Sequence, residues 1–145
     1  MTIGTVLLLE DEPIIALDIE KLLQENGADK VVTLSTCAEA IGWLGVNTPN
    51  IAIVDPRLSD GVCSYAVKTL AERSVPFILY SGEPDAAIES EPAFSAGQLL
   101  YKPCEPDRLI AALSRAAIGS FEHFHRKGRP TRLPLKKGTN RTTGL

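Results

Sequence analysis

The sequence predicts an α/β fold, with a doubly wound five-stranded parallel sheet and helices on both of its faces. Five short runs rich in Val, Ile and Leu recur along the chain, and each is nearly continuous in apolarity. Strands have this composition when helices cover both faces of a parallel sheet. Stretches with helical periodicity separate the runs, and such alternation produces parallel strands joined by right-handed crossovers.

The predicted elements follow one another in regular order. The strands lie at residues 5–10, 30–34, 51–55, 76–80 and 98–101. The clearest helices lie at residues 13–26, 37–44, 64–72 and 105–118. The first helix starts with Pro13, which suits a first turn, and Gly27 follows it as a C-cap. Thr36 is the expected N-cap of the second helix, and we expect the last helix to end at Gly119.

Composition indicates one folded domain with a core. The chain has 145 residues, 44% of them hydrophobic, which suits a single domain. Its apolar runs are too short to span a bilayer, and its start lacks the pattern of a signal peptide. The cysteines are odd in number, widely spaced and outside any C-x-x-C motif, and they are Cys37, Cys63 and Cys104. We therefore expect reduced thiols in a cytoplasmic protein.

The charge is distributed unevenly along the chain. Residues 1–125 carry all 18 acidic and 8 of the 15 basic side chains, a formal charge of −10. Residues 126–145 carry the other 7 basic side chains, and they are rich in Gly, Pro and Thr without apolar periodicity. We therefore expect a folded domain at residues 1–120 and a basic, flexible tail at residues 121–145.

Polar side chains stand where four of the predicted strands end. Glu10 and Asp11 end the first strand, Asp55 the third, Ser81 the fourth and Lys102 the fifth. The carboxyl ends of parallel strands share one edge of the sheet, which is where sites form in such folds. Two carboxylates about 5 Å apart repel by roughly 3 kcal/mol at an effective dielectric of about 20, so this edge needs a cation.

Magnesium is the cation that these residue types favour. Asp11 and Asp55 offer hard oxygen ligands, and Mg²⁺ needs only one or two direct carboxylates beside waters and a phosphate. Glu10 can join through a water molecule. Each feature alone has a plainer interpretation, since acids favour helix N-termini and Asp-Pro or Ser-Gly pairs favour turns. Their occurrence at successive strand ends favours a site.

The chain resembles the receiver domain of bacterial two-component response regulators over residues 4–118. The resemblance is carried by "LLLEDEP", "IVDPRLSDG", "YSG" and "YKP", in that order. It implies a flavodoxin-like sheet of order 2-1-3-4-5 and a phosphoryl group accepted by Asp55 from a histidine kinase. It also implies Mg²⁺ bound by Asp11, Asp55 and the backbone carbonyl of Arg57. Lys102 would pair with the phosphoryl group, and Ser81 would hydrogen-bond to it.

Two features depart from the usual receiver pattern. Leu99 stands where many receivers carry a Tyr or Phe that changes rotamer on activation. The stretch "PFILYSGEPD" resembles an atypical subgroup of stand-alone receivers with the motif P-F-x-[FL]-x-[TS]-G. The segment at residues 83–97, which follows it, holds two prolines that limit any helix to a short piece around residues 85–91. We expect this segment to be reordered on phosphorylation, because switch elements are locally unstable.

The resemblance implies a stand-alone signalling protein rather than an enzyme. Its expected partners are a histidine kinase and a downstream protein or phosphotransfer protein, with no specific nucleic acid and no membrane. We expect a monomer or weak homodimer. The alternative is an aspartate-nucleophile phosphohydrolase of the haloacid dehalogenase type, but Arg57 stands where that class has a second aspartate. A flavodoxin-like flavin module is disfavoured because acids follow the first strand where a phosphate loop would lie.

Overall fold

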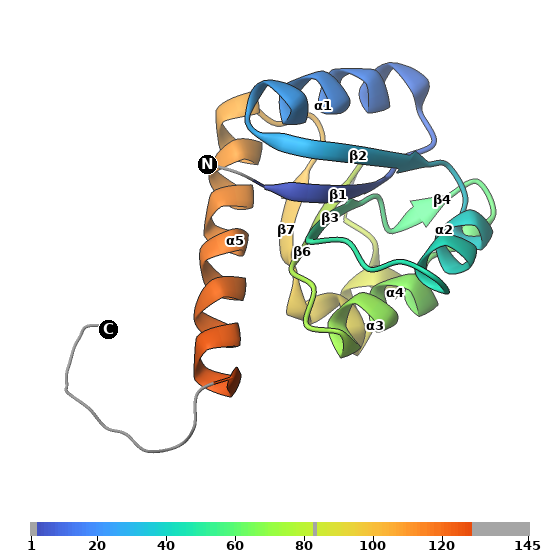
Figure 1. The fold of residues 1–145 in the computed structure, drawn as a ribbon. Coiled ribbons are helices and arrows are strands. Elements are labelled where there is room, and N and C mark those ends of the chain that lie inside the picture. Colours follow the sequence, from blue (N-terminus) through green and yellow to red (C-terminus); the bar gives the residue numbers. More distant parts are fainter. Residues whose placement is uncertain (1–2, 83, 129–145) are drawn as a thin grey trace.

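The sheet strands form where the sequence has its apolar runs. A computed structural model describes residues 3–82 and 84–128 (Figure 1). The central sheet is parallel, in the order β2-β1-β3-β6-β7. These strands are β1 (Gly4–Leu9), β2 (Ala28–Leu34), β3 (Ile51–Val54), β6 (Phe77–Ser81) and β7 (Gln98–Tyr101). Counted among sheet strands alone, this is the order 2-1-3-4-5, so the predicted fold class is confirmed.

Helices cover both faces of this sheet. They are α1 (Pro13–Glu25), α2 (Cys37–Leu44), α3 (Ser64–Glu72), α4 (Ala86–Glu89) and α5 (Pro106–Gly128), with a 3₁₀ helix η1 (Pro92–Ala96). Helices α1 and α5 contribute to the hydrophobic cluster on one face, and α2, α3, α4 and η1 contribute to the cluster on the other. Among the described residues, no helix has both the length and the apolar character needed to cross a membrane.

Strand β1 shows why its apolar run is continuous. Side chains alternate between the two faces of a strand. Accordingly, Leu7 and Leu9 join the cluster of α2 and α3, while Val6 and Leu8 join the cluster of α1 and α5. All four side chains are fully buried. A polar residue at any of these positions would have to lie in one of the two cores.

Local sequence signals fix the helix ends that matter for the site. Pro13 begins α1 directly after the acidic residues. At α2, the Thr36 hydroxyl accepts a hydrogen bond from the Glu39 amide, and the Glu39 carboxylate accepts one from the Ser35 amide. The first bond satisfies a backbone donor that a helix start leaves unpaired, and the second holds the residue before the cap. Gly27 adopts a φ of 102° after α1, a conformation that other residues rarely adopt.

The structure corrects two boundaries. Helix α5 continues through Gly119 to Gly128, so the expected helix end is wrong. One glycine costs about 1 kcal/mol in a helix, which is too little to end a helix that its neighbours favour. A two-stranded antiparallel ribbon was also not expected; it comprises β4 (Arg57–Leu58) and β5 (Gly61–Val62). The domain boundary near residue 120 stays a prediction, and residues 129–145 of the expected tail lie outside the described residues.

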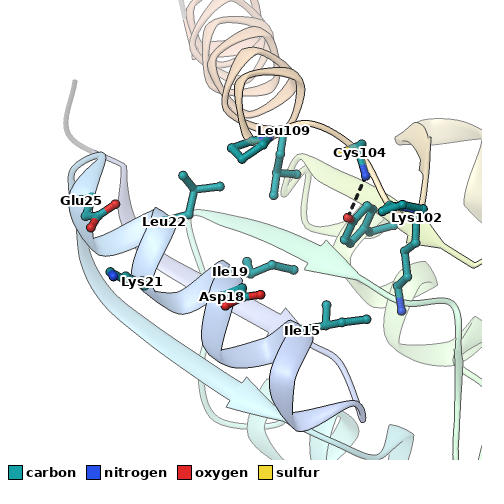
Figure 2. Close-up of a pocket in the computed structure, with 12 residues that line it drawn as sticks. Ile15, Asp18, Ile19, Lys21, Leu22, Glu25, Lys102, Cys104 and Leu109 are labelled. Atoms are coloured by element: carbon teal, nitrogen blue, oxygen red, sulfur yellow. Dashed lines mark hydrogen bonds between the residues drawn. The ribbon is translucent and has the colours of Figure 1, made fainter.

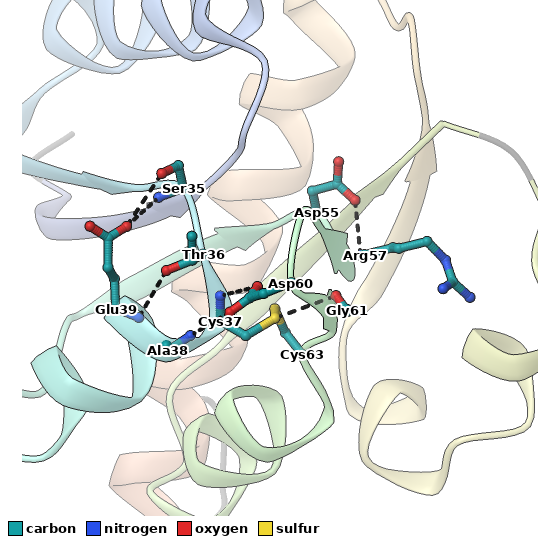
Figure 3. Close-up of a disulfide and its surroundings, with 10 residues drawn as sticks. All are labelled: Ser35, Thr36, Cys37, Ala38, Glu39, Asp55, Arg57, Asp60, Gly61 and Cys63. Carbon is teal, nitrogen blue, oxygen red and sulfur yellow. Dashed lines mark hydrogen bonds between the residues drawn. A yellow bond between two sulfur atoms is a disulfide. The ribbon is translucent and has the colours of Figure 1, made fainter.

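A disulfide joins Cys37 to Cys63 (Figure 3), so the expectation of reduced thiols is wrong for this pair. The Asp60 carboxylate accepts hydrogen bonds from the backbone amides of Cys37 (2.8 Å) and Ala38 (3.0 Å). These bonds hold the β4–β5 ribbon against the start of α2. The two cysteine Cα atoms are therefore 5.3 Å apart, within the range that a disulfide bridges. Cys104 is a free thiol.

Candidate functional site

Backbone hydrogen bonds bring the polar strand ends together. The ladder continues one residue past each strand, because the Glu10 amide donates to Leu34 and the Asp55 amide donates to Leu9. In the same way the Lys102 amide donates to the carbonyl of Ser81 at 2.7 Å. The side chains of Glu10, Asp55 and Lys102 thus leave the sheet at one edge, as the sequence predicted.

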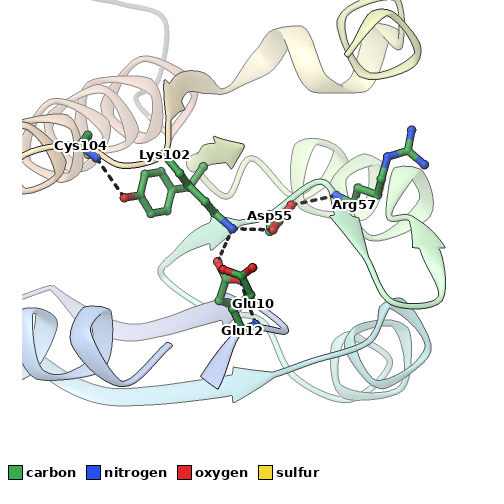
Figure 4. Close-up of polar contacts among 7 residues, drawn as sticks. Glu10, Glu12, Asp55, Arg57, Lys102 and Cys104 are labelled. Atoms are coloured by element: carbon green, nitrogen blue, oxygen red, sulfur yellow. Dashed lines mark hydrogen bonds and ion pairs between the residues drawn. The ribbon is translucent and has the colours of Figure 1, made fainter. Parts of the chain in front are cut away.

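Lys102 forms ion pairs with two carboxylates at this edge (Figure 4). Its Nζ lies 2.9 Å from Glu10 Oε1 and 2.7 Å from Asp55 Oδ2. The Glu10 side chain is only 1% exposed, and those of Asp55 and Lys102 are 12% and 13% exposed. Backbone amides complete the arrangement, since Glu12 donates to Glu10 Oε2 and Arg57 donates to Asp55 Oδ1, each at 3.1 Å.

The charge states of this group follow from burial and hydrogen bonding. Burial raises the pKa of Glu10, and the hydrogen bond from Lys102 opposes that effect only in part. For Lys102, burial would lower the pKa, but hydrogen bonds to Asp55 and Glu10 outweigh it, and the net shift is upward. Lys102 is therefore a firmly protonated cation, while Glu10 carries an energetically costly charge.

Three carboxylates form a group with the donor chemistry of a divalent metal site. One oxygen each from Glu10, Asp11 and Asp55 lies within 4.8 Å of the others. All are hard oxygen donors, and Asp11 and Asp55 are partly accessible, so the set fits Mg²⁺ rather than a soft metal. The charges of three acids exceed that of one lysine, which leaves this edge with an unbalanced negative charge.

The site opens into a cavity of about 670 Å³. All of the predicted site residues except Glu10 line it, namely Asp11, Asp55, Arg57, Ser81 and Lys102. Ser81 itself is 7% exposed. Five of the six predicted residues therefore surround one common space, although their chemical roles remain predictions.

A second ion pair, between two residues that line this cavity, was not predicted. Arg57 donates from Nε (3.0 Å) and Nη2 (2.7 Å) to Oδ2 of Asp85. Arg57 lies in β4, and Asp85 directly precedes α4, so the pair joins the loop after Asp55 to the segment after Ser81. The two residues are 28 positions apart without any shared motif, so the sequence carried no signal for their contact.

An aromatic ring supports Lys102 from its other side. Nζ of Lys102 lies 5.7 Å from the centre of the Tyr80 ring, a distance at which a cation and an aromatic face attract. The Tyr80 hydroxyl accepts a hydrogen bond from the Cys104 amide at 3.3 Å. The alternation of side chains along a strand predicts that Tyr80 and Ser81 point to opposite faces of the sheet. It does not predict that the Tyr80 ring contacts Lys102.

A second cavity of about 500 Å³ lies between α1 and the start of α5 (Figure 2). Apolar side chains from both helices line it, including Ile15, Ile19 and Leu109. Lys102 lines both cavities, and Tyr80 lies in the wall of this one. The lysine therefore stands between the acidic site and an apolar groove on the α1 side of the sheet.

Comparison with known proteins agrees with this geometry. A family model described as the response regulator receiver domain matches residues 6–114. The phyllosphere-induced regulator PhyR of Methylorubrum extorquens is 32% identical over 117 residues, which cover 77% of this chain and 42% of PhyR. The chain thus spans less than half the length of that relative.

Solved structures agree in fold. A response regulator receiver protein from Sinorhizobium medicae is 26% identical, with a TM-score of 0.72 over 81% of this chain and 96% of that one. The receiver domain of the sensor histidine kinase PA1611 from Pseudomonas aeruginosa, solved with magnesium in its active site cleft, is 23% identical. Its TM-score is 0.67 over 78% of this chain and 96% of that one. The chain belongs to the response regulator receiver domain family of two-component signalling.

Proposed function

We propose that the chain is a phosphoacceptor whose Asp55 takes a phosphoryl group from the phosphohistidine of a histidine kinase. The observation that carries the proposal is the position of the Asp55 carboxylate. It lies between the Lys102 ammonium and the Arg57 amide, beside Glu10 and Asp11, and it lines the cavity. Three carboxylates that repel one another around one lysine have no evident use in stabilising the fold.

The chemistry requires little more than alignment and charge compensation. A carboxylate oxygen of Asp55 attacks phosphorus, the bond from phosphorus to the histidine nitrogen breaks, and an aspartyl phosphate forms. Phosphoryl transfer is catalysed mainly by positioning and by neutralising charge. Fixed hydrogen bonds from Lys102 and Arg57 hold the carboxylate in one orientation before the donor arrives.

Magnesium is the proposed cofactor, and when bound it would neutralise charge on the phosphoryl oxygens. Asp11, Asp55 and the backbone carbonyl of Arg57 would hold it, with Glu10 joining through water. The carboxylate spacing and the hard oxygen donors support this assignment. The related PA1611 receiver domain was solved with magnesium in its active site cleft, which also supports it.

Lys102 and Ser81 complete the proposed phosphoryl site. The Lys102 ammonium already contacts Asp55, and it would pair with a phosphoryl oxygen formed there. The Ser81 side chain lines the same cavity and would donate a hydrogen bond to another oxygen. Ser81 ends β6 and Lys102 follows β7, and these two strands are paired in the sheet.

The proposed output is a protein interaction or a phosphorelay step. The partners would be a histidine kinase and a downstream protein or phosphotransfer protein, in the cytoplasm, with the chain a monomer or weak homodimer. We propose no enzymatic turnover beyond slow loss of its own phosphate, and no specific nucleic acid or membrane partner. The P-F-x-[FL]-x-[TS]-G subgroup remains a prediction from the stretch "PFILYSGEPD".

Intact mass spectrometry after incubation with a panel of phosphorylated histidine kinases, or with acetyl phosphate, tests the proposal. We expect one base-labile phosphoryl group that requires Mg²⁺ and is lost in Asp55→Asn. Asp29→Asn is the matched control, because Asp29 is an exposed aspartate at the start of β2. Labelling that persists in Asp55→Asn, or that ignores Mg²⁺, would overturn the assignment.

A further inference from the structure

The Arg57–Asp85 pair lies in the wall of the cavity that holds the proposed phosphoryl site. The backbone amide of Arg57 donates to Asp55, so its side chain starts next to the phosphoacceptor carboxylate. The guanidinium nevertheless extends away from Asp55, as Figures 3 and 4 show, and contacts Asp85 instead. Both side chains line the same cavity, and the Arg57 side chain is 53% exposed, so it has room to adopt another rotamer.

Charge counting gives this arginine a second candidate partner. Three acids are balanced by Lys102 together with one divalent cation. A phosphoryl group carries roughly −1.5 to −2, whereas the Asp55 carboxylate that it replaces carries −1. Phosphorylation therefore adds up to about one negative charge that the balanced group does not offset. The Arg57 guanidinium is the cation nearest along the chain, and its planar donors match phosphate oxygens well.

We propose that the Arg57 guanidinium is a further ligand of the phosphoryl group on Asp55, and that Asp85 holds it in reserve until that group is present. The inference rests on the proposed function, since it needs a phosphoryl group at Asp55. The exchange breaks the contact between Arg57 and Asp85 and makes one between Arg57 and a phosphoryl oxygen. No covalent bond changes in this step.

The exchange would carry the signal into the segment after Ser81. The carbonyl of Asp85 accepts hydrogen bonds from the amides of Ile88 (3.1 Å) and Glu89 (2.9 Å), which are in α4. A four-residue helix cannot be stable by itself, so α4 depends on its contacts. Releasing Asp85 removes one of these contacts. The Arg57–Asp85 pair thus offers a route to the output segment that does not use an aromatic residue at position 99.

The affinity for beryllofluoride, a phosphoryl mimic, tests the exchange when measured calorimetrically with saturating Mg²⁺. Arg57→Ala removes the proposed ligand and should weaken binding about five- to tenfold. Asp85→Asn frees Arg57 and should tighten binding about two- to fivefold, the range for an exposed ion pair. Arg73→Ala is the matched control and should change nothing, because Arg73 is an exposed arginine that donates to Asn47 and Thr48.

The opposite signs are what separate this proposal from a structural role. If the pair only held α4 in place, both variants would break it alike and shift the affinity in the same direction. Hydrogen exchange gives a second readout: without beryllofluoride, the Ile88 and Glu89 amides should exchange faster in both variants than in the wild type. Beryllofluoride should speed the exchange of these two amides in the wild type. In Arg57→Ala, it should not speed their exchange beyond the rate seen without it.

The results also separate the two proposals from each other. If the beryllofluoride affinity shifts in the same direction in both variants, or shifts in neither, the partner exchange is overturned. The proposed function still stands in that case if the wild type binds beryllofluoride. A wild-type chain that is not phosphorylated at Asp55 and does not bind beryllofluoride overturns both. Opposite shifts with an unchanged Arg73→Ala control support the exchange.

Discussion

Removing the Lys102 charge is the most direct perturbation of the site. Lys102→Met keeps most of the apolar stem against Tyr80 but deletes the ammonium that contacts Glu10 and Asp55. The carboxylates of Glu10 and Asp55 then lie near each other and near Asp11 without a cation between them. Glu10 cannot turn to solvent, because its side chain is 1% exposed and ends a buried strand.

The size of the effect follows from the geometry. Two carboxylate oxygens within 4.8 Å of each other repel by at least about 3.5 kcal/mol at an effective dielectric of about 20. Breaking a buried ion pair by removing one partner costs about 3–5 kcal/mol. Asp11 and Asp55 are partly exposed, which screens their share. We therefore expect Lys102→Met to lower the free energy of unfolding by about 3 kcal/mol without Mg²⁺, with the fold retained.

Urea unfolding at neutral pH measures this loss. The m-value should stay constant, because the folded surface does not change. Glu10→Gln in the Lys102→Met background should restore more than half of the loss, since it removes the most buried charge. Lys68→Met, at an exposed position of α3, is the matched control and should stay within about 0.5 kcal/mol of the wild type. A loss below about 1 kcal/mol in Lys102→Met, or no restoration by Glu10→Gln, would refute the electrostatic reasoning.

Three further predictions concern the metal, pH and the disulfide. Mg²⁺ at 100 times its dissociation constant should stabilise the wild type by about 2.7 kcal/mol. Asp11→Asn should be more stable than the wild type without Mg²⁺, but Mg²⁺ should stabilise it less. A wild-type melting temperature that does not change with Mg²⁺ would contradict the metal site. Because the folded pKa of Glu10 is raised, its stabilising contribution is complete below the unfolded pKa and is lost as pH rises through the folded pKa. The wild type should therefore gain stability relative to Glu10→Gln as pH falls from neutral, and parallel pH profiles would disprove this. Reducing the Cys37–Cys63 disulfide, which spans 26 positions, should cost about 3 kcal/mol by loop entropy, whereas Cys104→Ser should not alter the response to reductant.

The parallel sheet was predictable because its central strands β1, β3 and β6 are buried on both faces. Continuous apolar runs such as 51–54 are typical of buried parallel strands when helical stretches separate them. The predicted convergence of Glu10, Asp55 and Lys102 then needed only the rule that parallel strands end at one edge. The place of a residue at the end of a strand depends on the sequence around it, so the sequence alone could predict it.

The features that were missed depend on contacts between distant residues. The β4–β5 ribbon has two residues in each strand, too few for any periodicity to appear. The disulfide depends on Asp60 holding this ribbon against α2, and the spacing of the cysteines carries no trace of that contact. The contact between Arg57 and Asp85 likewise depends on where two loops lie after folding.

The two halves of the site differ in how firmly they are held, and this difference suits a signalling protein. Glu10 and Asp55 follow the buried strands β1 and β3, and the Lys102 amide is hydrogen-bonded to Ser81 at the end of the buried strand β6, so the backbone of all three is held by the sheet. Arg57 and Asp85 lie on a two-residue strand and before a four-residue helix, which few backbone hydrogen bonds hold. A reaction centre gains from a fixed geometry, whereas an output must respond to about one unit of added charge. On the proposed exchange, charge added at the rigid half is relieved in part by movement in the weaker half, and that movement is what a partner protein would recognise.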